Sequence, residues 1–159
     1  MAEDNIASGG QALTDTFYLE RFVMAHQAQL DDALSELEAG QKETHWMWFI
    51  FPIAPGLAKS DIGQYYEISG LDEACAFLAH PELGDNFRRC LAVMLAHSGK
   101  SVLDILGKKD KWKFQASVTL FHHVANDPAL KADLKACLDN FYDGRPCIST
   151  SKYLASITA

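Results

Sequence analysis

Apolar side chains recur every three or four residues over most of the chain, which is the spacing of amphipathic helices. The first such stretch begins at Asp15 and ends at Gly40, a residue type that commonly follows the last turn of a helix. It predicts one long helix, or two shorter ones with a break near Ala28. Residues 1–14 are small and polar instead, so we expect a flexible N-terminal tail there.

Helix start signals continue in the middle of the chain. Ser69 and Asp72 have the spacing of a capping box ahead of residues 73–79. Pro81 suits the first turn of a helix over residues 82–97, because proline lacks the amide hydrogen that a first turn leaves unpaired.

The C-terminal part shows three more polar residues that can cap helices. They are Ser101 before a short turn, Asp110 before residues 111–125, and Asp127 before residues 128–142. Gly144 closes the last of these helices. Beyond it we expect an irregular tail with one helical turn after Ser149.

Two segments lack a helical period. Residues 45–51 read HWMWFIF, a continuous apolar run that fits either a buried strand or a buried turn of helix. Residues 64–69 contain strand-forming side chains, but a single such segment allows at most a minor hairpin. The pattern therefore predicts a mainly α fold, a compact multi-helix single domain over residues 15–159. The expected core contains Leu34, Leu37, Trp48, Phe49, Leu91, Leu95, Leu120 and Leu138.

Composition supports this picture and narrows the function. The 159 residues are 48% apolar and 22% charged, which is an ordinary mixture for a packed domain. A net charge of -7 argues against general nucleic-acid binding and against an anionic membrane surface. No apolar run approaches the ~18 residues of a membrane span. The four cysteines show no C-x-x-C pairing, so we expect free thiols and a cytoplasmic protein.

The first cluster of candidate functional residues contains Lys42, His45, Trp46 and Trp48. Indole rings can stack on a planar ligand, and an imidazole with a pKa of roughly 6.5 can act as a catalytic acid or base. We therefore consider His45 a candidate catalytic residue, and the other three candidate ligand-binding residues. The alternative is that the aromatic side chains form core and that His45 bonds a backbone carbonyl group.

The second cluster is the sequence KKDKWK at residues 108–113, immediately before a predicted helix. A helix start binds anions through its free amides and its positive dipole end. Lys113 and Ser117 would share one helix face, with Thr119 on a neighbouring face. These three residues are candidate ligand-binding residues. The alternative is that the exposed lysines only keep a loop in water.

Other chemistry finds no support in the sequence. The six histidines show no H-x-x-x-H or H-E-x-x-H spacing, and no nucleophile elbow, P-loop or dinucleotide fingerprint occurs, so we predict no metal and no cofactor. If the protein is an enzyme, we expect a hydrolase that acts on a glycosidic or phosphate bond, with His45 as acid or base and Lys113 stabilising negative charge.

Several stretches also match a family pattern. They are FVxA at residues 22–25, ALxELxxGxK at 33–42, HWMWFIFP at 45–52, LAHPxLG at 78–84, and DxxKxxxSxTLF at 110–121. Together they resemble a bacterial family of uncharacterised, mainly helical proteins that is sometimes labelled calpastatin-like. The resemblance covers about residues 18–145 and implies a compact helical fold, without an established activity.

The chain departs from the family pattern at four positions. Family members favour Gln where this chain has His26 and Ile53, Ser where it has Ala116, and Asp where it has Cys147. If these residues line a shared pocket, this protein binds a different ligand from its relatives, or none.

Two functional hypotheses follow. The first is a pocket for a small anionic aromatic ligand, such as a nucleotide or an ADP-ribose-like compound, built from the HWMW run and the KKDKWK helix start. The second is a protein–protein interaction module or a homo-oligomer without small-molecule chemistry, in which the aromatic side chains are core and an exposed helix face binds a partner. The exposure of Trp46 and Trp48 beside a cavity distinguishes the two.

Overall fold

The computed structural model describes residues 15–158, and the expected N-terminal tail over residues 1–14 lies outside them. Nine helices make up most of this described part. They are α2 (Glu20–Ala39), α3 (Met47–Ile50), α4 (Asp61–Tyr65), α5 (Leu71–Ala79), α6 (Pro81–Ala96), α7 (Val102–Leu106), α8 (Lys108–Val124), α9 (Pro128–Tyr142) and α10 (Ile148–Thr158). The prediction of a mainly α fold is confirmed.

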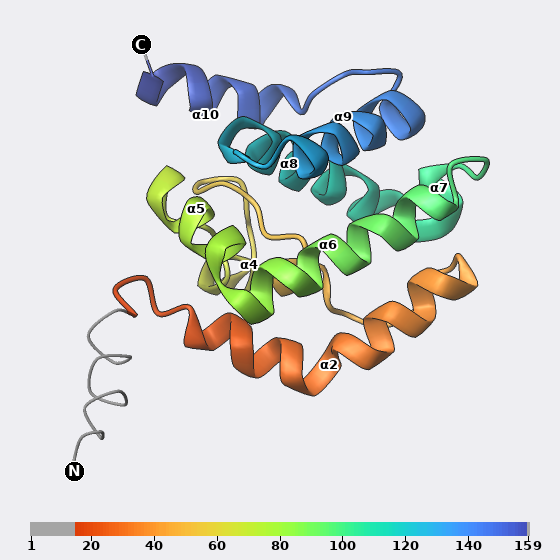
Figure 1. Ribbon diagram of the computed structural model, residues 1–159, viewed down its shortest axis with the longest axis horizontal. Helices are drawn as coiled ribbons and strands as arrows, with labels where there is room; N and C mark the ends of the chain where they lie inside the picture. The colour runs from red at the N-terminus through yellow and green to blue at the C-terminus, as the bar shows by residue number, and fades with distance from the viewer. Residues whose placement is uncertain (1–14, 159) are drawn as a thin grey trace.

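The longer helices stack in layers. From bottom to top, Figure 1 shows α2, then α6, then α8 with α9, and finally α10. The helix α6 packs against α2, α5 and α9, while α8 packs against α5, α7, α9 and α10. Both helices are therefore central, and α8 joins the main body to the C-terminal helix.

The core is rich in phenylalanine. Phe51, just after α3, lies against Phe114 of α8 with ring centroids 4.8 Å apart, and Phe87 of α6 is equally close to Phe121 of α8. Edge-on and tilted aromatic pairs of this kind are favourable beyond the apolar area that they bury. Six of the eight expected core residues are buried, whereas Trp48 and Leu95 are only half-buried.

Local capping signals predicted several helix ends well. Gly40 ends α2 in the left-handed conformation at φ 77°. Ser101 accepts hydrogen bonds from two amides of α7, and Asp127 accepts one from the amide of Ala129 in α9. Pro81 begins α6, as predicted, although the cap in front of it is the ring nitrogen of His80.

Residues 64–69 form no strand, in agreement with the expectation of at most a minor hairpin, and Ser60 caps the short helix α4, which includes Gln64 and Tyr65. The predictions for the C-terminal tail and for the start of α8 are wrong. The tail after Gly144 is not irregular, because α10 packs along α8. Asp110 does not cap α8, which begins three residues earlier than expected, at Lys108, with Gly107 at φ 88° in front of it.

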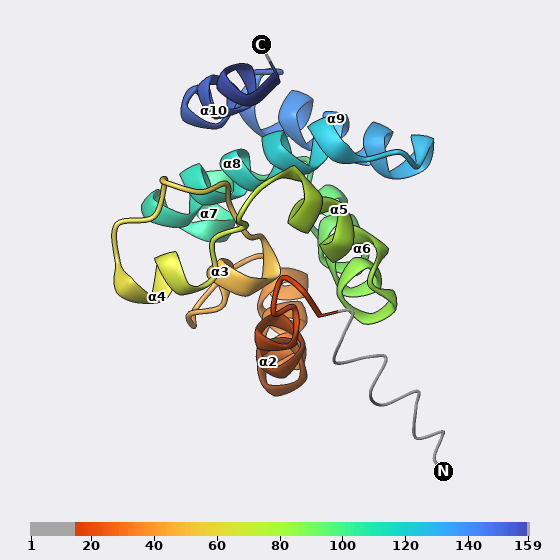
Figure 2. The same ribbon diagram turned by 90° about the vertical axis from the view of Figure 1, so that its left-hand side faces the viewer.

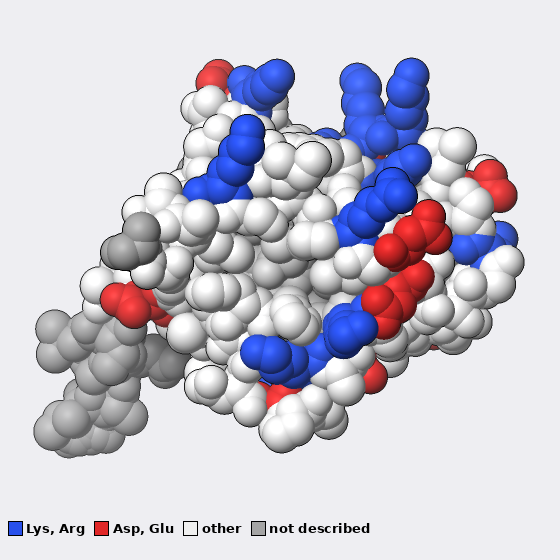
Figure 3. Space-filling model, turned by 90° about the horizontal axis from the view of Figure 1, so that it is seen from above, with Lys and Arg blue, Asp and Glu red and all other residues white. Residues whose placement is uncertain are grey.

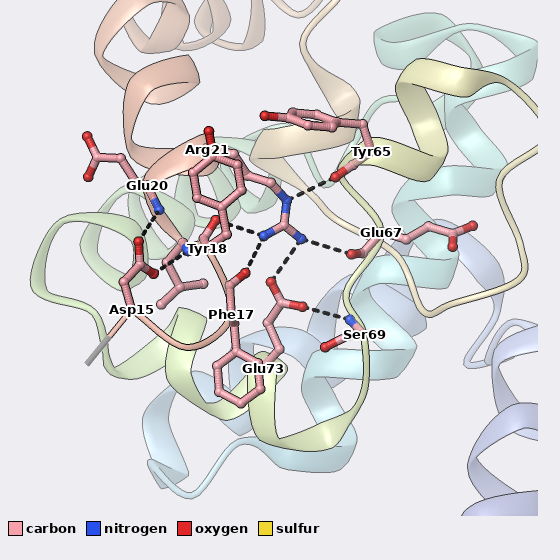
Figure 4. A network of polar contacts seen from close by, with 10 residues as sticks. Asp15, Phe17, Tyr18, Glu20, Arg21, Tyr65, Glu67, Ser69 and Glu73 are labelled. Atoms are coloured by element: carbon pink, nitrogen blue, oxygen red, sulfur yellow. Dashed lines mark hydrogen bonds and ion pairs between the residues drawn. The ribbon is translucent and has the colours of Figure 1, made fainter. Parts of the chain in front are cut away.

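The predicted capping box before α5 does not form, and a network around a buried arginine lies there instead. Arg21 is 8% exposed and pairs with the carboxylate of Glu73 at 2.9 Å (Figure 4). It also donates hydrogen bonds to four backbone carbonyl groups, those of Phe17, Tyr18, Tyr65 and Glu67. Glu73, not Asp72, completes the local motif by accepting the amide hydrogen of Ser69. A buried charge is tolerated when it is paired in this way, and the network fixes α2 to the segment between α4 and α5.

The helices are too short or too polar for a membrane. Across residues 15–158, none combines the length and the apolar character that are needed to span a bilayer.

Candidate functional site

A cavity of about 760 Å³ opens between the loop after α3 and the first turns of α8. Figure 2 shows this loop, between α3 and α4, running beside α8. We call the space the lysine cavity. Its lining consists of Trp48, Gly56, Leu57, Ala58, Lys59, Ser60, Lys108, Lys109, Trp112, Lys113 and Ser149. Four parts of the chain thus meet here: α3, the loop over residues 56–60, the start of α8 and the start of α10.

The loop wall is held from behind by polar side chains. The carboxylate of Glu67 accepts the amide hydrogens of Gly56 at 3.2 Å and Ala58 at 2.8 Å. The side-chain amide of Gln64 donates to the carbonyl oxygen of Ala58. Because Arg21 binds the backbone carbonyl of the same Glu67, the buried network in Figure 4 also supports this wall.

Two indole rings line the lysine cavity. Trp48 is half-buried, and the ammonium group of Lys113 lies 4.0 Å from the centre of its ring, a cation–π contact. Gly63 packs so closely that a Cβ there would lie 2.9 Å from the Trp48 ring, so this position holds the indole in place. Trp112, on the first turns of α8, is 36% exposed and offers its ring to solvent.

Lysine side chains dominate the charge of the cavity. Lys59, Lys108, Lys109 and Lys113 all line it, and none of the lining residues, all within the described part of the chain, is acidic. Figure 3 looks onto the α10 side of the molecule, where Lys and Arg side chains are more prominent than Asp and Glu. In a protein with a net charge of -7, this is a local reversal of sign.

Asp110 organises the inner end of the lysine group. Its carboxylate pairs with Lys42 at 2.7 Å and with Lys113 at 3.0 Å. Partial burial favours a higher pKa for this carboxyl group, but the hydrogen bonds and charges of the two lysines outweigh burial, and the pKa of Asp110 lies below its ordinary value. Lys42 is thereby brought to the start of α8, although it is outside the cavity lining.

The remaining candidate residues lie elsewhere. Trp46 is fully buried, and its indole N–H donates to Glu36 at 2.8 Å, so its ring is core. His45 is exposed and does not line the lysine cavity.

Ser117 is buried, and its hydroxyl group has no hydrogen-bond partner among residues 15–158. Thr119 is buried too, and its hydroxyl oxygen accepts the amide hydrogen of Cys147. Of the predicted ligand-binding residues, the structure brings Trp48 and Lys113 to the cavity.

Sequence reasoning missed five lining residues of consequence. Lys108, Lys109 and Trp112 lie within the basic segment KKDKWK, and their position in the first turns of α8 could be found once the helix start was placed at Gly107. Lys59 and Ser149 come from a loop and from an unpredicted helix, and no local pattern marks them.

Three of the positions that depart from the family pattern come together in space. Ile53, Ala116 and Cys147 are buried in one small apolar cluster with Ala58, against which Trp48 and Leu57 pack. This cluster lies directly behind the cavity wall, because Trp48, Leu57 and Ala58 also line the cavity. His26 is separate, buried between Phe49 and Asn86.

The arrangement is suited to holding an anion beside a planar group. The cavity offers ammonium groups, two indoles and the hydroxyl groups of Ser60 and Ser149. No imidazole or carboxylate is among its lining residues, each of which the structure describes, so the groups that usually transfer protons are not at its wall. Within residues 15–158 no three His, Cys, Asp or Glu side chains are placed to hold a metal ion.

Comparison with known proteins gives a family but no activity. The chain is similar to the conserved hypothetical protein Rv1873 from Mycobacterium tuberculosis, known from a crystal structure at 1.38 Å. The sequence identity is 37%, the TM-score is 0.84, and the match covers 89% of this chain and 99% of the other. No functionally curated protein matches. Residues 16–154 match the family described as "Protein of unknown function (DUF1810)", and the chain belongs to this family.

Proposed function

We propose that the protein binds a small anionic ligand with an aromatic ring, of the nucleotide class, in the lysine cavity. The observation that carries this proposal is the meeting of four lysines and two indoles around one cavity that lacks an acidic lining residue. The overall charge of -7 repels anions at long range, so binding must depend on these short-range contacts.

The size of the cavity supports the proposal. Pockets for drug-sized ligands and cofactors usually measure about 300–1,000 Å³, and the value of about 760 Å³ lies within this range. The lining combines apolar and aromatic surface with a few polar groups, which is typical of such pockets. A mononucleotide fits this chemistry better than a bare phosphate, which would use only the lysines.

The four lysines of the cavity differ in whether a carboxylate already pairs with them. Lys113 is already paired with Asp110 and covers one face of Trp48, whereas Lys59, Lys108 and Lys109 pair with no carboxylate in the described chain. An attraction between unit charges at 4 Å is worth about 1 kcal/mol in water and about 4 kcal/mol near a protein surface. The three unpaired lysines therefore supply the phosphate-binding charge.

Trp112 supplies the stacking surface. Its side chain is partly exposed, while Trp48 is covered on one face by Lys113. Stacking of a base on an aromatic side chain contributes about 1–3 kcal/mol. We therefore assign the ring of the ligand to Trp112, and we assign to Trp48 the role of an inner wall.

A ligand series tests the proposal. We expect AMP to raise the melting temperature and to quench tryptophan fluorescence, because a ligand that binds only the folded state stabilises it. Adenosine lacks the phosphate and pyrophosphate lacks the ring, so each should bind more weakly than AMP. Lys109→Ala and Trp112→Ala should each weaken AMP binding roughly tenfold, the equivalent of ~1.4 kcal/mol.

The matched control is Lys131→Ala, which removes an exposed lysine from α9, away from the cavity lining. It should leave AMP binding unchanged. The proposal is refuted if AMP produces neither a melting shift nor quenching, or if Lys131→Ala weakens binding as much as Lys109→Ala does.

The interaction-module alternative rests on a different observation. Trp112 is 36% exposed and Ile148, at the start of α10, is 73% exposed, so apolar surface faces solvent on neighbouring helices. If this surface joins two copies of the chain, the molar mass in solution should rise with concentration and Ile148→Ser should abolish that rise. Such a result together with no ligand response would favour the alternative.

A further inference from the structure

A second cavity adjoins the lysine cavity. It measures about 710 Å³, and Trp112 and Ser149 line both spaces. The remaining wall comes from the segment before α10 and from α10 itself, including Arg145, Ile148 and Lys152. We call this space the Arg145 cavity.

We infer that the two cavities bind the two halves of one ligand of dinucleotide size, in which two ring-bearing units are joined by a phosphate linkage that passes Trp112. This inference rests on the proposed function, because it assigns the phosphate and the first ring to the lysine cavity. It adds a second subsite and a substrate class, since a mononucleotide would leave the Arg145 cavity empty.

The charge of both spaces supports a ligand whose phosphate linkage lies between them. The Arg145 cavity contains two cations, Arg145 and Lys152, and no carboxylate is among its lining residues, which all lie in the described chain. The same holds for the lysine cavity. Positive groups thus occur on both sides of Trp112. An arginine can also bind a phosphate through two parallel hydrogen bonds or stack on a ring.

The apolar part of the second wall suits a ring or a sugar. Pro146, Ile148 and Ala155 line the Arg145 cavity together with Cys147. Ile148 is 73% exposed and therefore offers aliphatic surface to a bound group. A second ring lying on Ile148 and beside Trp112 would cover this surface.

Both halves of the site are held by the same helix. The side-chain amide of Gln115 donates to the carbonyl oxygen of Arg145 at 2.9 Å, and Thr119 accepts the amide hydrogen of Cys147 at 2.9 Å. Thr150 donates to the carbonyl oxygen of Ala116. These contacts fix the segment before α10 to α8, which also carries Trp112. The two cavities therefore keep a constant spacing, and this favours a ligand of fixed length.

Calorimetric titration with AMP, ADP-ribose and NAD tests the inference. We expect ADP-ribose and NAD to bind about tenfold more tightly than AMP, because their second halves reach the Arg145 cavity. The double variant Arg145→Ala with Lys152→Ala should remove this gain and leave AMP binding unchanged. Lys109→Ala should weaken all three ligands, and Lys131→Ala should weaken none. Circular dichroism and melting curves of each variant verify folding.

The outcomes separate the two proposals. If AMP binds but the longer ligands bind no more tightly, or if the double variant affects AMP and NAD equally, the second subsite is wrong and the proposed function stands. If none of the three ligands binds, the proposed function fails and this inference fails with it. If short oligonucleotides bind more tightly with every added nucleotide, the site is an open nucleic-acid groove and the fixed-length ligand is refuted.

Discussion

The carboxylate of Glu36 in α2 holds the aromatic run in its folded position. One of its oxygens accepts hydrogen bonds from the amides of Glu43 and Thr44 and from the indole N–H of Trp46, and the other accepts from the hydroxyl of Thr44. The chain is thereby turned so that Trp46 enters the core, which places Trp48 at the cavity. We expect Glu36→Gln to destabilise the fold at neutral pH.

The size of this effect follows from the pKa of Glu36. Partial burial favours a higher pKa, but the hydrogen bonds from Thr44, Glu43 and Trp46 outweigh it and lower the pKa from 4.5 to about 2. At 1.36 kcal/mol for each pKa unit, the charged form has an upper limit of roughly 3 kcal/mol of stabilisation. The side chain is partly exposed to water, which screens it, so we expect a loss of about 1–2 kcal/mol for Glu36→Gln.

Urea unfolding followed by circular dichroism measures the difference between the variant and the wild type. The folded pKa lies below the unfolded one, so the stabilisation is complete above pH 4.5 and is lost as the pH falls towards 2. The difference in unfolding free energy between Glu36→Gln and the wild type should therefore disappear at acid pH. Glu36→Ala should cost more, because it also leaves the buried Trp46 N–H without an acceptor.

The control is Glu38→Gln, an exposed position on the same helix, which should change the unfolding free energy by less than about 0.5 kcal/mol. A Glu36→Gln gap that stays constant between neutral and acid pH, or that is no larger than the Glu38→Gln effect, would refute the reasoning.

Three further predictions concern the core. Leu37→Ala, at a fully buried position, should lower the unfolding free energy by about 2–5 kcal/mol in urea titrations. Gly84→Ala should lower the unfolding free energy by ~1–3 kcal/mol, because the new Cβ would lie 2.1 Å from the carbonyl oxygen of Leu78. At Gly99 a Cβ meets no atom within 4 Å, so Gly99→Ala should be tolerated. Burial lowers the pKa of His26 below 6.5, although its bond to a backbone carbonyl opposes this. The stability of the fold should therefore decrease as the pH drops below 6.5. In melting curves measured at several pH values, His26→Gln should abolish this dependence of stability on pH.

The helices that could be predicted are those whose ends are set by capping residues close to them in the sequence. Gly40, Ser101 and Asp127 act on amides or carbonyls within a few residues, so their effect is visible in the sequence. The helix α10 has no such signal and contains several Ser and Thr residues, which are weak helix formers. Its formation depends on packing against α8, a contact between segments more than 20 residues apart, as in the 28-residue separation of Cys147 and Thr119.

The candidate site, too, could be predicted only where it depends on residues close together in the sequence. The basic segment at residues 108–113 was recognisable as a group, but its orientation was not, because Asp110 binds the distant Lys42 instead of capping α8. The HWMW run gave two indoles as candidates, and only the structure separates them. Trp46 has the carboxylate of Glu36 as a partner for its N–H and becomes core, whereas Trp48 is left at the cavity wall.

The charges at the start of α8 divide into an inner and an outer group, and this division determines how lysine substitutions should be interpreted. Inside, Asp110 joins Lys42 and Lys113, so the three side chains together carry a single positive charge and hold the helix start against the segment after α2. Outside, Lys59, Lys108 and Lys109 have no carboxylate to neutralise them within residues 15–158. Replacing Lys113 therefore removes a structural contact together with any ligand contact, because it leaves Asp110 with one partner fewer. Replacing Lys59, Lys108 or Lys109 removes charge without breaking such a pair, so these variants show whether the cavity attracts an anion.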